Sequence, residues 1–283
     1  MSTATSSPRQ NRRRLLPAGG WLSVYAALYV AFLYVPVLFL PIFSVNTAAT
    51  PKFPLSGFTW KWYEGLPHTP ELLNAAWNSL IVGLSASVLS TVLGILAARA
   101  ITRYRFPGRR PINGLIMAPL VLPEIIIAIS MLLVILQLGL SLSLFTVVLG
   151  HVLVCIPYSM TVLTSGFEGF DRSLEEASAD LGESAFGTFR RVTLPMVTPA
   201  IISSLLVSFT ISLDEFIIAF FLTGTEATLP IYIWGQLRFA AKLPGVLALG
   251  TLLLVASFIL LSVAEVLRRR AARRTQSEGG PYA

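Results

Sequence analysis

The sequence predicts an all-α membrane protein with six spanning helices, and three observations lead to this prediction. Hydrophobic residues make up 54% of the 283 positions and charged residues only 12%, whereas soluble domains carry about 25% charged residues. Six apolar stretches are each long enough to cross a bilayer, which takes about 20 helical residues. The cationic residues gather in those connecting segments that would share one side of the membrane.

The six apolar stretches are bounded by charged residues or by Pro and Gly. They cover residues 21–45, 76–100, 112–138, 144–165, 196–222 and 245–267. Internal prolines interrupt several of them, and membrane helices tolerate such prolines better than soluble helices do. The first stretch follows three arginines, like a secretory signal, but it is longer than the roughly 7–15 apolar residues of a signal. We therefore expect an uncleaved membrane anchor.

The distribution of Lys and Arg predicts the orientation. With both termini in the cytoplasm, all but four of the 21 Lys and Arg residues are cytoplasmic; the four are Lys52, Lys61, Arg238 and Lys242. Short cytoplasmic segments of membrane proteins carry this excess of positive charge. The same distribution accounts for the basic pI, so we expect no nucleic-acid partner.

These observations predict five consecutive parts. They are a cytoplasmic tail (1–20), a first helix (21–45), a periplasmic loop (46–71), a core with helices two to six (72–267) and a second cytoplasmic tail (268–283). The aromatic and proline-rich residues of the periplasmic loop suit either an interfacial aromatic belt or a docking surface for an extracytoplasmic partner. The outer segment 223–243 is a second candidate for such docking.

Cysteine and histidine offer little chemistry. Cys155 is the only cysteine and cannot form an intrachain disulfide, so we expect a buried small side chain. His151 lies four residues earlier, on the same helix face, but the pair lacks a third ligand for a metal. We expect a packed polar contact at His151, with no metal, no cofactor and no catalytic residues.

The cytoplasmic segment 166–194 is far more polar than its surroundings. Ser173 and Glu176 have the spacing of a helix capping box, Gly182 suits a helix end, and Ser184 suits a second N-cap. Apolar residues recur at helical spacing in both halves; they are Leu174, Ala177, Leu181, Phe186, Phe189 and Val192. We expect an amphipathic helical hairpin that is presented to a cytosolic partner.

A motif within this segment resembles a known family. The residues Glu175-Glu176-Ala177-Ser178-Ala179-Asp180-Leu181-Gly182, followed after nine residues by Val192-Thr193-Leu194-Pro195, are similar to the EAA-x3-G-x9-I-x-L-P loop of binding-protein-dependent ABC importer permeases. Ser178 replaces the second Ala of that pattern, and Val192 replaces Ile. The resemblance implies the type I permease fold, with residues 72–267 as its transmembrane core and 166–195 as its coupling loop.

The resemblance also implies partners and roles. The loop would form a coupling helix that docks into an ATPase subunit, and its coupling residues would be Glu175, Glu176, Ala177, Gly182, Leu194 and Pro195. Glu176 would contact the ATPase or cap its own helix, Gly182 would permit the turn, and Leu194 and Pro195 would start the fifth span. Two ATPase subunits, a second homologous permease, a periplasmic substrate-binding protein and the lipid bilayer are the implied partners.

The chain itself lacks the means to hydrolyse ATP. A phosphate-binding P-loop needs Gly-Lys-Ser/Thr, and none of the three lysines, Lys52, Lys61 and Lys242, follows a glycine. We therefore expect a non-enzymatic subunit that depends on a separate ATPase.

Three carboxylates interrupt the apolar stretches: Glu124, Asp214 and Glu215. A charge at mid-bilayer costs roughly 2.5–3.5 kcal/mol on insertion scales, and such residues usually face a cavity. The same spans carry no Lys or Arg in their cores, so the natural partner is a cation in transit. Asp214 and Glu215 are adjacent and point about 100° apart, so both cannot face one pathway. The alternative is that each is protonated or hydrogen-bonded to a helix end.

Further segments resemble spermidine/putrescine permeases in particular. They are Ser212–Ala219, Gly224 with Thr228-Leu229-Pro230, Phe58–Tyr63 and Met117–Glu124, and the resemblance spans about residues 20–268. It implies a polyamine substrate and a bacterial inner-membrane location. Related importers for iron, opines or other organic solutes share parts of these patterns. An ion-coupled secondary transporter would also use intramembrane acids, but it needs no such loop.

Overall fold

The computed structural model describes residues 19–48 and 50–259, and almost all of them are helical. The predicted all-α fold is thereby confirmed for this part of the chain. The predicted tails 1–20 and 268–283 and the end of the sixth predicted span lie outside the described residues, apart from Gly19 and Gly20.

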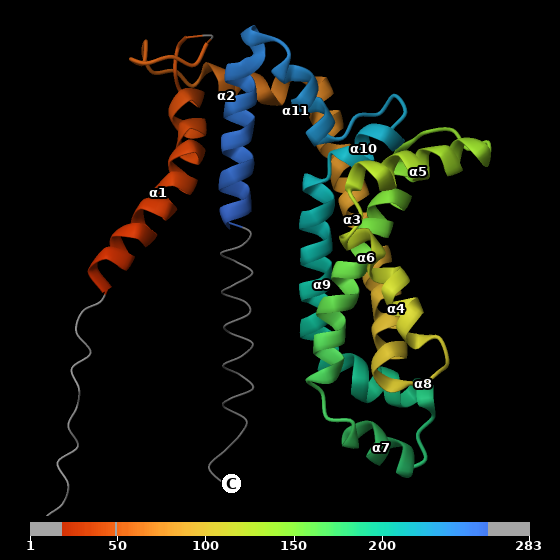
Figure 1. The fold of residues 1–283 in the computed structure, drawn as a ribbon. Helices are drawn as coiled ribbons and strands as arrows, with labels where there is room; N and C mark the ends of the chain where they lie inside the picture. The colour runs from red at the N-terminus through yellow and green to blue at the C-terminus, as the bar shows by residue number, and fades with distance from the viewer. Residues whose placement is uncertain (1–18, 49, 260–283) are drawn as a thin grey trace, which may run out of the picture. The chain divides into compact units, whose positions relative to one another are not determined.

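Eleven labelled α-helices and four short helices follow one another along the described chain (Figure 1). The α-helices are α1 (Gly19–Ser44), α2 (Lys61–Gly65), α3 (Pro70–Arg103), α4 (Arg109–Met117), α5 (Glu124–Gln137), α6 (Leu144–Glu168), α7 (Ser173–Asp180), α8 (Ala185–Thr188), α9 (Leu194–Asp214), α10 (Ile217–Leu222) and α11 (Leu229–Leu237). The short ones are the 3-10 turns η1 (Leu66–His68), η2 (Ala118–Leu120) and η4 (Ala240–Lys242) and the π-helix η3 (Phe189–Thr193). The last apolar helix is Ala240–Ile259.

The chain divides into two units, of which the first comprises the described residues up to Tyr63 and from Ala241 onward. In this unit the residues after α1 form an ordered loop around the buried Asn46. The Asn46 side-chain oxygen accepts a hydrogen bond from the Ser56 amide (3.0 Å). The backbone carbonyl of Asn46 accepts one from the Trp62 indole N–H (2.8 Å). These hydrogen bonds hold the predicted aromatic loop in a defined conformation, in which Phe58 and Trp60 are exposed.

Five helices of the described chain are long and apolar enough to cross a membrane. They are Trp21–Ser44, Pro70–Arg103, Leu144–Glu168, Ala185–Asp214 and Ala240–Ile259. The third predicted span, 112–138, is not one straight helix, because Arg109–Leu120 and Glu124–Gln137 meet at an angle of 105°; counted as one bent span, this pair gives the described chain six. Pro123 has no N–H to continue the helix and disfavours helical geometry at the residue before it, so α5 starts afresh at Glu124.

The fifth predicted span, 196–222, also differs from the structure. The apolar helix starts earlier, at Ala185, and ends at Asp214. Glu215 then takes an extended conformation, with ψ of 111°, and the chain resumes as α10. The break leaves backbone donors without helical partners, and the Glu215 carboxylate accepts one of them, the Ile218 N–H, at 2.9 Å.

The second unit, Glu64–Ala240, is built on three long helices, α3, α6 and α9 (Figure 1). Glycines let these helices approach closely. A Cβ added at Gly94 would lie 2.8 Å from Ser159, and one at Gly166 would lie 2.4 Å from Ala200. Lipid offers helices no hydrophobic drive to associate, so small residues that permit backbone contact stabilise such a bundle.

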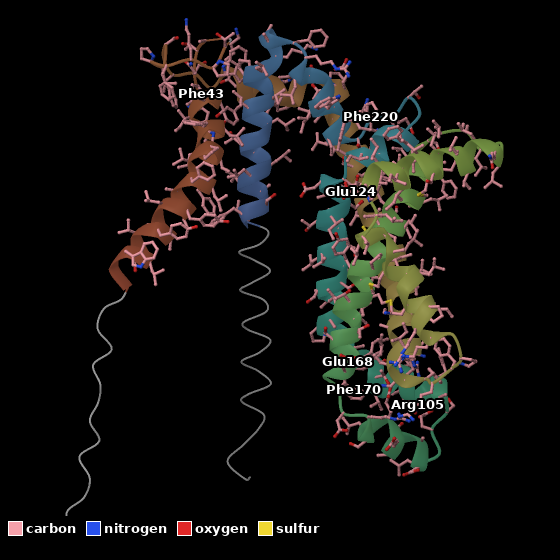
Figure 2. The ribbon with its side chains drawn as sticks, viewed as in Figure 1. Phe43, Arg105, Glu124, Glu168, Phe170 and Phe220 are labelled. Atoms are coloured by element: carbon pink, nitrogen blue, oxygen red, sulfur yellow. The ribbon has the colours of Figure 1, made fainter. Side chains whose placement is uncertain are left out.

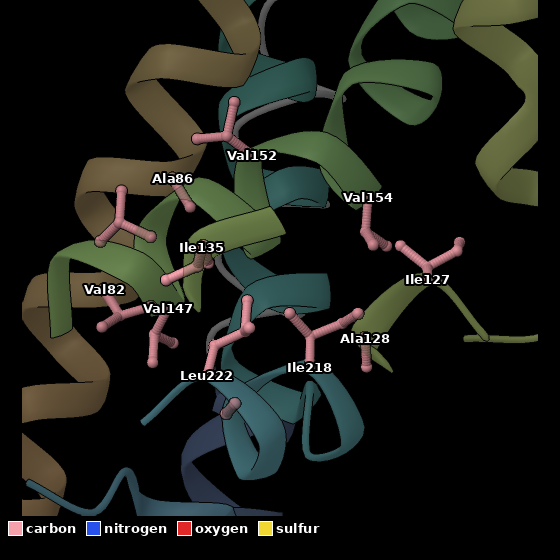
Figure 3. Packing of buried hydrophobic residues seen from close by; sticks show 12 residues of the cluster. Val82, Ala86, Ile127, Ala128, Ile135, Val147, Val152, Val154, Ile218 and Leu222 are labelled. Atoms are coloured by element: carbon pink, nitrogen blue, oxygen red, sulfur yellow. The ribbon is translucent and has the colours of Figure 1, made fainter. Parts of the chain in front are cut away.

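An apolar cluster joins α3, α5, α6 and α10 in the same unit (Figure 3). Its buried members are Val82, Ala86, Ile127, Ala128, Ile135, Val147, Val148, Val152, Val154, Ile218, Ala219 and Leu222. This packing holds α10 against α5 and α6, beyond the break that follows α9.

Buried hydroxyls connect the three long helices. The Ser159 and Ser208 hydroxyls lie 2.8 Å apart, those of Thr91 and Ser204 lie 3.1 Å apart, and His151 Nδ1 lies 2.7 Å from the Ser212 hydroxyl. The predicted polar contact at His151 is confirmed, as is the burial of Cys155, which is 1% exposed. In the described part of the chain, no three His, Cys, Asp or Glu residues gather to hold a metal.

The close packing of α6 on α10 can be tested at Gly150. A Cβ there would lie 2.4 Å from Ile218 and 2.6 Å from Leu222. We expect Gly150→Ala to lower the free energy of unfolding by about 1–3 kcal/mol, the usual cost of overpacking. A thiol-reactive fluorophore reports unfolding directly, because Cys155 is the only cysteine and is buried.

The matched control is Gly114→Ala, since a Cβ at Gly114 meets nothing within 4 Å. This control should leave the denaturant concentration at which half of Cys155 is labelled unchanged, or raise it. An unchanged midpoint for Gly150→Ala would contradict the close contact.

Candidate functional site

The loop 166–195, which includes Glu168 and Phe170, lies at one end of the three-helix bundle, near Arg105 (Figure 2). Glu124 lies far from this end. The first short helix of this loop, α7, begins at Ser173. The Asp171 carboxylate accepts a hydrogen bond from the Ser173 N–H at 2.9 Å, and this bond holds the pKa of Asp171 below its ordinary value. Asp171 thus supplies the acceptor at the start of α7.

The predicted capping box is therefore wrong. Ser173 lies inside the helix, the preceding Arg172 makes no side-chain cap, and Glu176 forms an ion pair with Arg172 at 3.0 Å instead. The short side chain of Asp171 reaches the amide two residues on, which is the usual geometry of an Asx turn. This interaction removes the need for a serine cap.

The turn between the two short helices agrees with the prediction. Gly182 has a φ of 88°, a conformation that other residues adopt only at a cost. The Ser184 hydroxyl accepts a hydrogen bond from the Gly187 N–H at 3.1 Å, so Ser184 is the N-cap of α8 as expected.

The second short helix does not stand apart from the fifth span. α8 continues through the π-helix η3 into α9, and α9 begins at Leu194 with Pro195 in its first turn. Pro195 has no N–H and its ring would crowd the carbonyl four residues earlier, so a wider π turn just before it relieves the conflict. Leu194 and Pro195 thus begin α9, but the helix is continuous from Ala185.

The two adjacent glutamates of the motif have opposite environments. Glu175 is 14% exposed, forms an ion pair with Arg103 Nε at 2.7 Å and accepts a hydrogen bond from the Thr193 hydroxyl at 2.6 Å. Glu176 is 63% exposed. Glu175 therefore faces the bundle, while Glu176 is open to a partner.

Apolar side chains beside Glu176 are also exposed. Leu181 is 89% exposed and Phe186 is 73% exposed, and Ala177 lies open on α7. Exposed large apolar side chains in a cluster indicate an interaction surface. Together with the predicted coupling residues, they form a face that a protein partner can cover.

The three carboxylates of the spans all lie at helix breaks. Glu124 is the first residue of α5 and Asp214 is the last of α9, and both are exposed. Glu215 is only 8% exposed and caps α10. The helix that Glu124 begins, α5, packs on α10, the helix that Glu215 caps. Glu215 is buried, whereas Glu124 and Asp214 are exposed.

An aromatic cluster begins at Phe216, the residue after Glu215. The Phe216 ring lies 5.4 Å from that of Trp234 and 5.5 Å from that of Phe220. The Trp234 and Phe220 side chains are each about half exposed. Among the described residues no ion pair involves Glu124, Asp214 or Glu215. The site therefore offers negative charge and aromatic faces, which suit a cation.

Sequence reasoning missed several residues that shape these sites. Arg103 and Thr193, the partners of Glu175, were assigned no role, because neither stands out in its local pattern. Arg103 is one of several arginines in its segment, and Thr193 occupies the variable position of the motif. Only their spatial proximity to Glu175 identifies them.

The chain is similar to known transport proteins of bacterial membranes. The family model described as "Binding-protein-dependent transport system inner membrane component" matches residues 90–273. The spermidine/putrescine transport system permease protein PotC of Haemophilus influenzae is 35% identical over 243 residues, covering 85% of this chain and 93% of that protein. The putrescine transport system permease protein PotI of Escherichia coli (strain K12) is 36% identical over 262 residues, covering 90% and 92%.

Solved structures agree with this fold. A chain of a bacterial ABC transporter that imports the acidic polysaccharide alginate has a TM-score of 0.70, at 18% identity, over 94% of this chain and 99% of that one. A bacterial alginate ABC transporter in complex with a periplasmic protein gives a TM-score of 0.65, at 15% identity, over 89% and 95%. At this identity the likeness concerns the fold alone.

The conformation of Gly182 yields a test of the loop. Gly182→Ala should strain the turn by about 1–2 kcal/mol, the cost of a left-handed conformation for a residue with a Cβ. Hydrogen exchange of the amides around the turn should then become faster. Gly235→Ala is the matched control, because both glycines have open space around them and only Gly182 has a positive φ. Equal exchange in Gly182→Ala and the wild type would contradict the assigned turn.

Proposed function

The chain belongs to the family of inner membrane components of binding-protein-dependent transport systems, and from this premise we propose that it imports a polyamine such as putrescine or spermidine. It would form one half of the translocation pathway of an ATP-driven importer. The observation that carries the substrate class is the exposure of Asp214 and Glu124 at helix breaks, with an aromatic cluster that begins at Phe216, two residues after Asp214. Relatives named as polyamine permeases support the same choice.

The other subunits follow from what this chain lacks. It carries no Gly-Lys pair for a P-loop, so two separate ATPase subunits would drive it. A second homologous permease would supply the other half of the pathway, and a periplasmic substrate-binding protein would deliver the solute. The charge distribution supports a cytoplasmic location for both termini, with the loop 166–195 on the ATPase side.

The coupling mechanism uses the exposed face of that loop. Glu176, Ala177, Leu181 and Phe186 would dock on the ATPase, and closure of the ATPase pair would push α7 and α8. Because α8 is continuous with α9 through η3, movement of the loop reaches a spanning helix without an intervening flexible segment. The result would be alternating access of the pathway to the two sides.

The carboxylates divide the work in the pathway. Asp214 and Glu124 would receive the ammonium groups, which lose part of their hydration in the membrane and need compensating charge. The aromatic faces of Phe220 and Trp234 would contact the chain and its cationic ends. Glu215 would hold the break in shape, since its carboxylate caps α10.

Substitution of these acids tests the proposal. Asp214→Asn and Glu124→Gln should each lower ATP-dependent uptake of radiolabelled putrescine or spermidine by about tenfold or more, because a hydrogen bond to a charged group contributes roughly 1.5–3 kcal/mol. The measurement is uptake into proteoliposomes that contain the complete importer. Glu168→Gln is the control, since Glu168 is an exposed acid at the end of α6 and is not among the proposed pathway or docking residues.

The outcomes separate the alternatives. Unimpaired uptake by both variants would remove the cation pathway. Uptake of an iron complex, an opine or another organic solute in place of polyamines would replace the substrate. Uptake that persists without any ATPase subunit would favour an ion-coupled secondary transporter.

A further inference from the structure

One largely shielded side chain joins the ends of two long helices to the coupling loop. Arg103 is the last residue of α3, and its Nη2 donates to the carbonyl of Phe167 at the end of α6 (3.0 Å) and to that of Phe170 just beyond it (3.4 Å). Its Nε forms an ion pair with Glu175 of α7 at 2.7 Å. Arg103 thus connects α3, α6 and α7.

The second carboxylate oxygen of Glu175 reaches the third long helix. The Thr193 hydroxyl donates to Oε1 at 2.6 Å, and Thr193 is fully buried immediately before α9. Both oxygens of one carboxylate are therefore engaged, one toward α3 and one toward α9. We call the group Arg103, Glu175 and Thr193 the latch.

Burial sets the latch apart from the other ion pairs of the loop. The side chains of Arg103 and Glu175 are 13% and 14% exposed, whereas those of Arg191 and Glu183, in the pair on the loop surface, are 75% and 30% exposed. Exposed pairs contribute little to stability, but removal of one partner from a shielded pair is costly. The latch is therefore the shielded ionic attachment of α7 to the bundle.

The main packing contacts of α7 lie within the loop. It packs on α8 and η3, and the Ser178 hydroxyl lies 3.0 Å from that of Thr188. These contacts hold the hairpin together without reaching the ends of α3 and α6. The latch supplies that connection.

We infer that Glu175 is a positioning residue that locks α7 to the ends of α3, α6 and α9, so that the loop and the bundle move as one body. This inference rests on the proposed function for its consequence in transport. It assigns different work to the two neighbouring glutamates. Glu176 faces outward to a partner, and Glu175 carries the displacement inward.

Hydrogen exchange on the full chain in lipid nanodiscs tests the latch directly. In Glu175→Gln the charge is lost, and the amides of residues 173–181 should exchange roughly tenfold faster, as expected when a local unit opens more often. Thr193→Val removes only the hydroxyl and should give a smaller increase in the same amides. Thr193→Ser keeps the hydroxyl and should match the wild type.

Two further variants and one measurement exclude simpler explanations. Glu176→Gln and Glu183→Gln remove carboxylates of the same loop that are less shielded than Glu175, and they should leave the exchange of residues 173–181 unchanged. Reactivity of the buried Cys155 reports whether the bundle is still folded in each variant. If Cys155 reactivity showed that Glu175→Gln disrupts the bundle, the exchange of residues 173–181 in Thr193→Val would test the latch in its place.

The assembled importer tests the consequence. Glu175→Gln should retain ATP hydrolysis stimulated by the loaded binding protein, because the outward face of α7 is intact, but should lose several-fold in solute imported per ATP hydrolysed. Unchanged exchange in both Glu175→Gln and Thr193→Val would overturn the latch. Faster exchange with an unchanged ratio of import to hydrolysis would overturn its role in coupling. Failure of wild-type uptake would refute the proposed function, and the exchange measurement would still decide the latch.

Discussion

The close approach of α6 to its neighbours is the constraint on which the rest of this structure depends. Gly94 on α3, and Gly150 and Gly166 on α6, stand where an added methyl group would collide with another helix. In lipid, helices gain nothing by hiding apolar side chains from one another, so contact between backbones and between small polar groups must hold them. The hydroxyls of Ser159 and Ser208 can pair only because the helices are this close.

The same apolar surroundings govern where the chain may break. A helix end inside a membrane exposes backbone groups that need partners. At the break after α9 the Glu215 carboxylate supplies one. Glu215 therefore matches the alternative that an intramembrane acid serves a helix end, whereas Asp214 and Glu124 stay exposed at their breaks. The three carboxylates therefore differ in their surroundings, although all three lie at helix breaks.

The loop 166–195 shows how far local patterns reach. The spacing of its motif predicted two short helices with a glycine turn and a serine cap, and Gly182 and Ser184 occupy those roles. The same reasoning failed at the start of α7, since Asp171 and Ser173 can both cap a helix and only the folded geometry selects Asp171. The count of apolar residues also did not predict the bend of the third span, which lies at Pro123.

The sequence by itself determined that this is a multi-spanning membrane protein of a particular transport family, because hydropathy and motif spacing are properties of neighbouring residues. The tertiary structure alone decided which of two adjacent glutamates turns inward. Glu175 is only 14% exposed because Arg103 and Thr193, from other parts of the chain, converge on it, and an ion pair in shielded surroundings needs all its partners at once. Such convergence depends on how α3, α6 and α9 pack, and no local pattern contains that information.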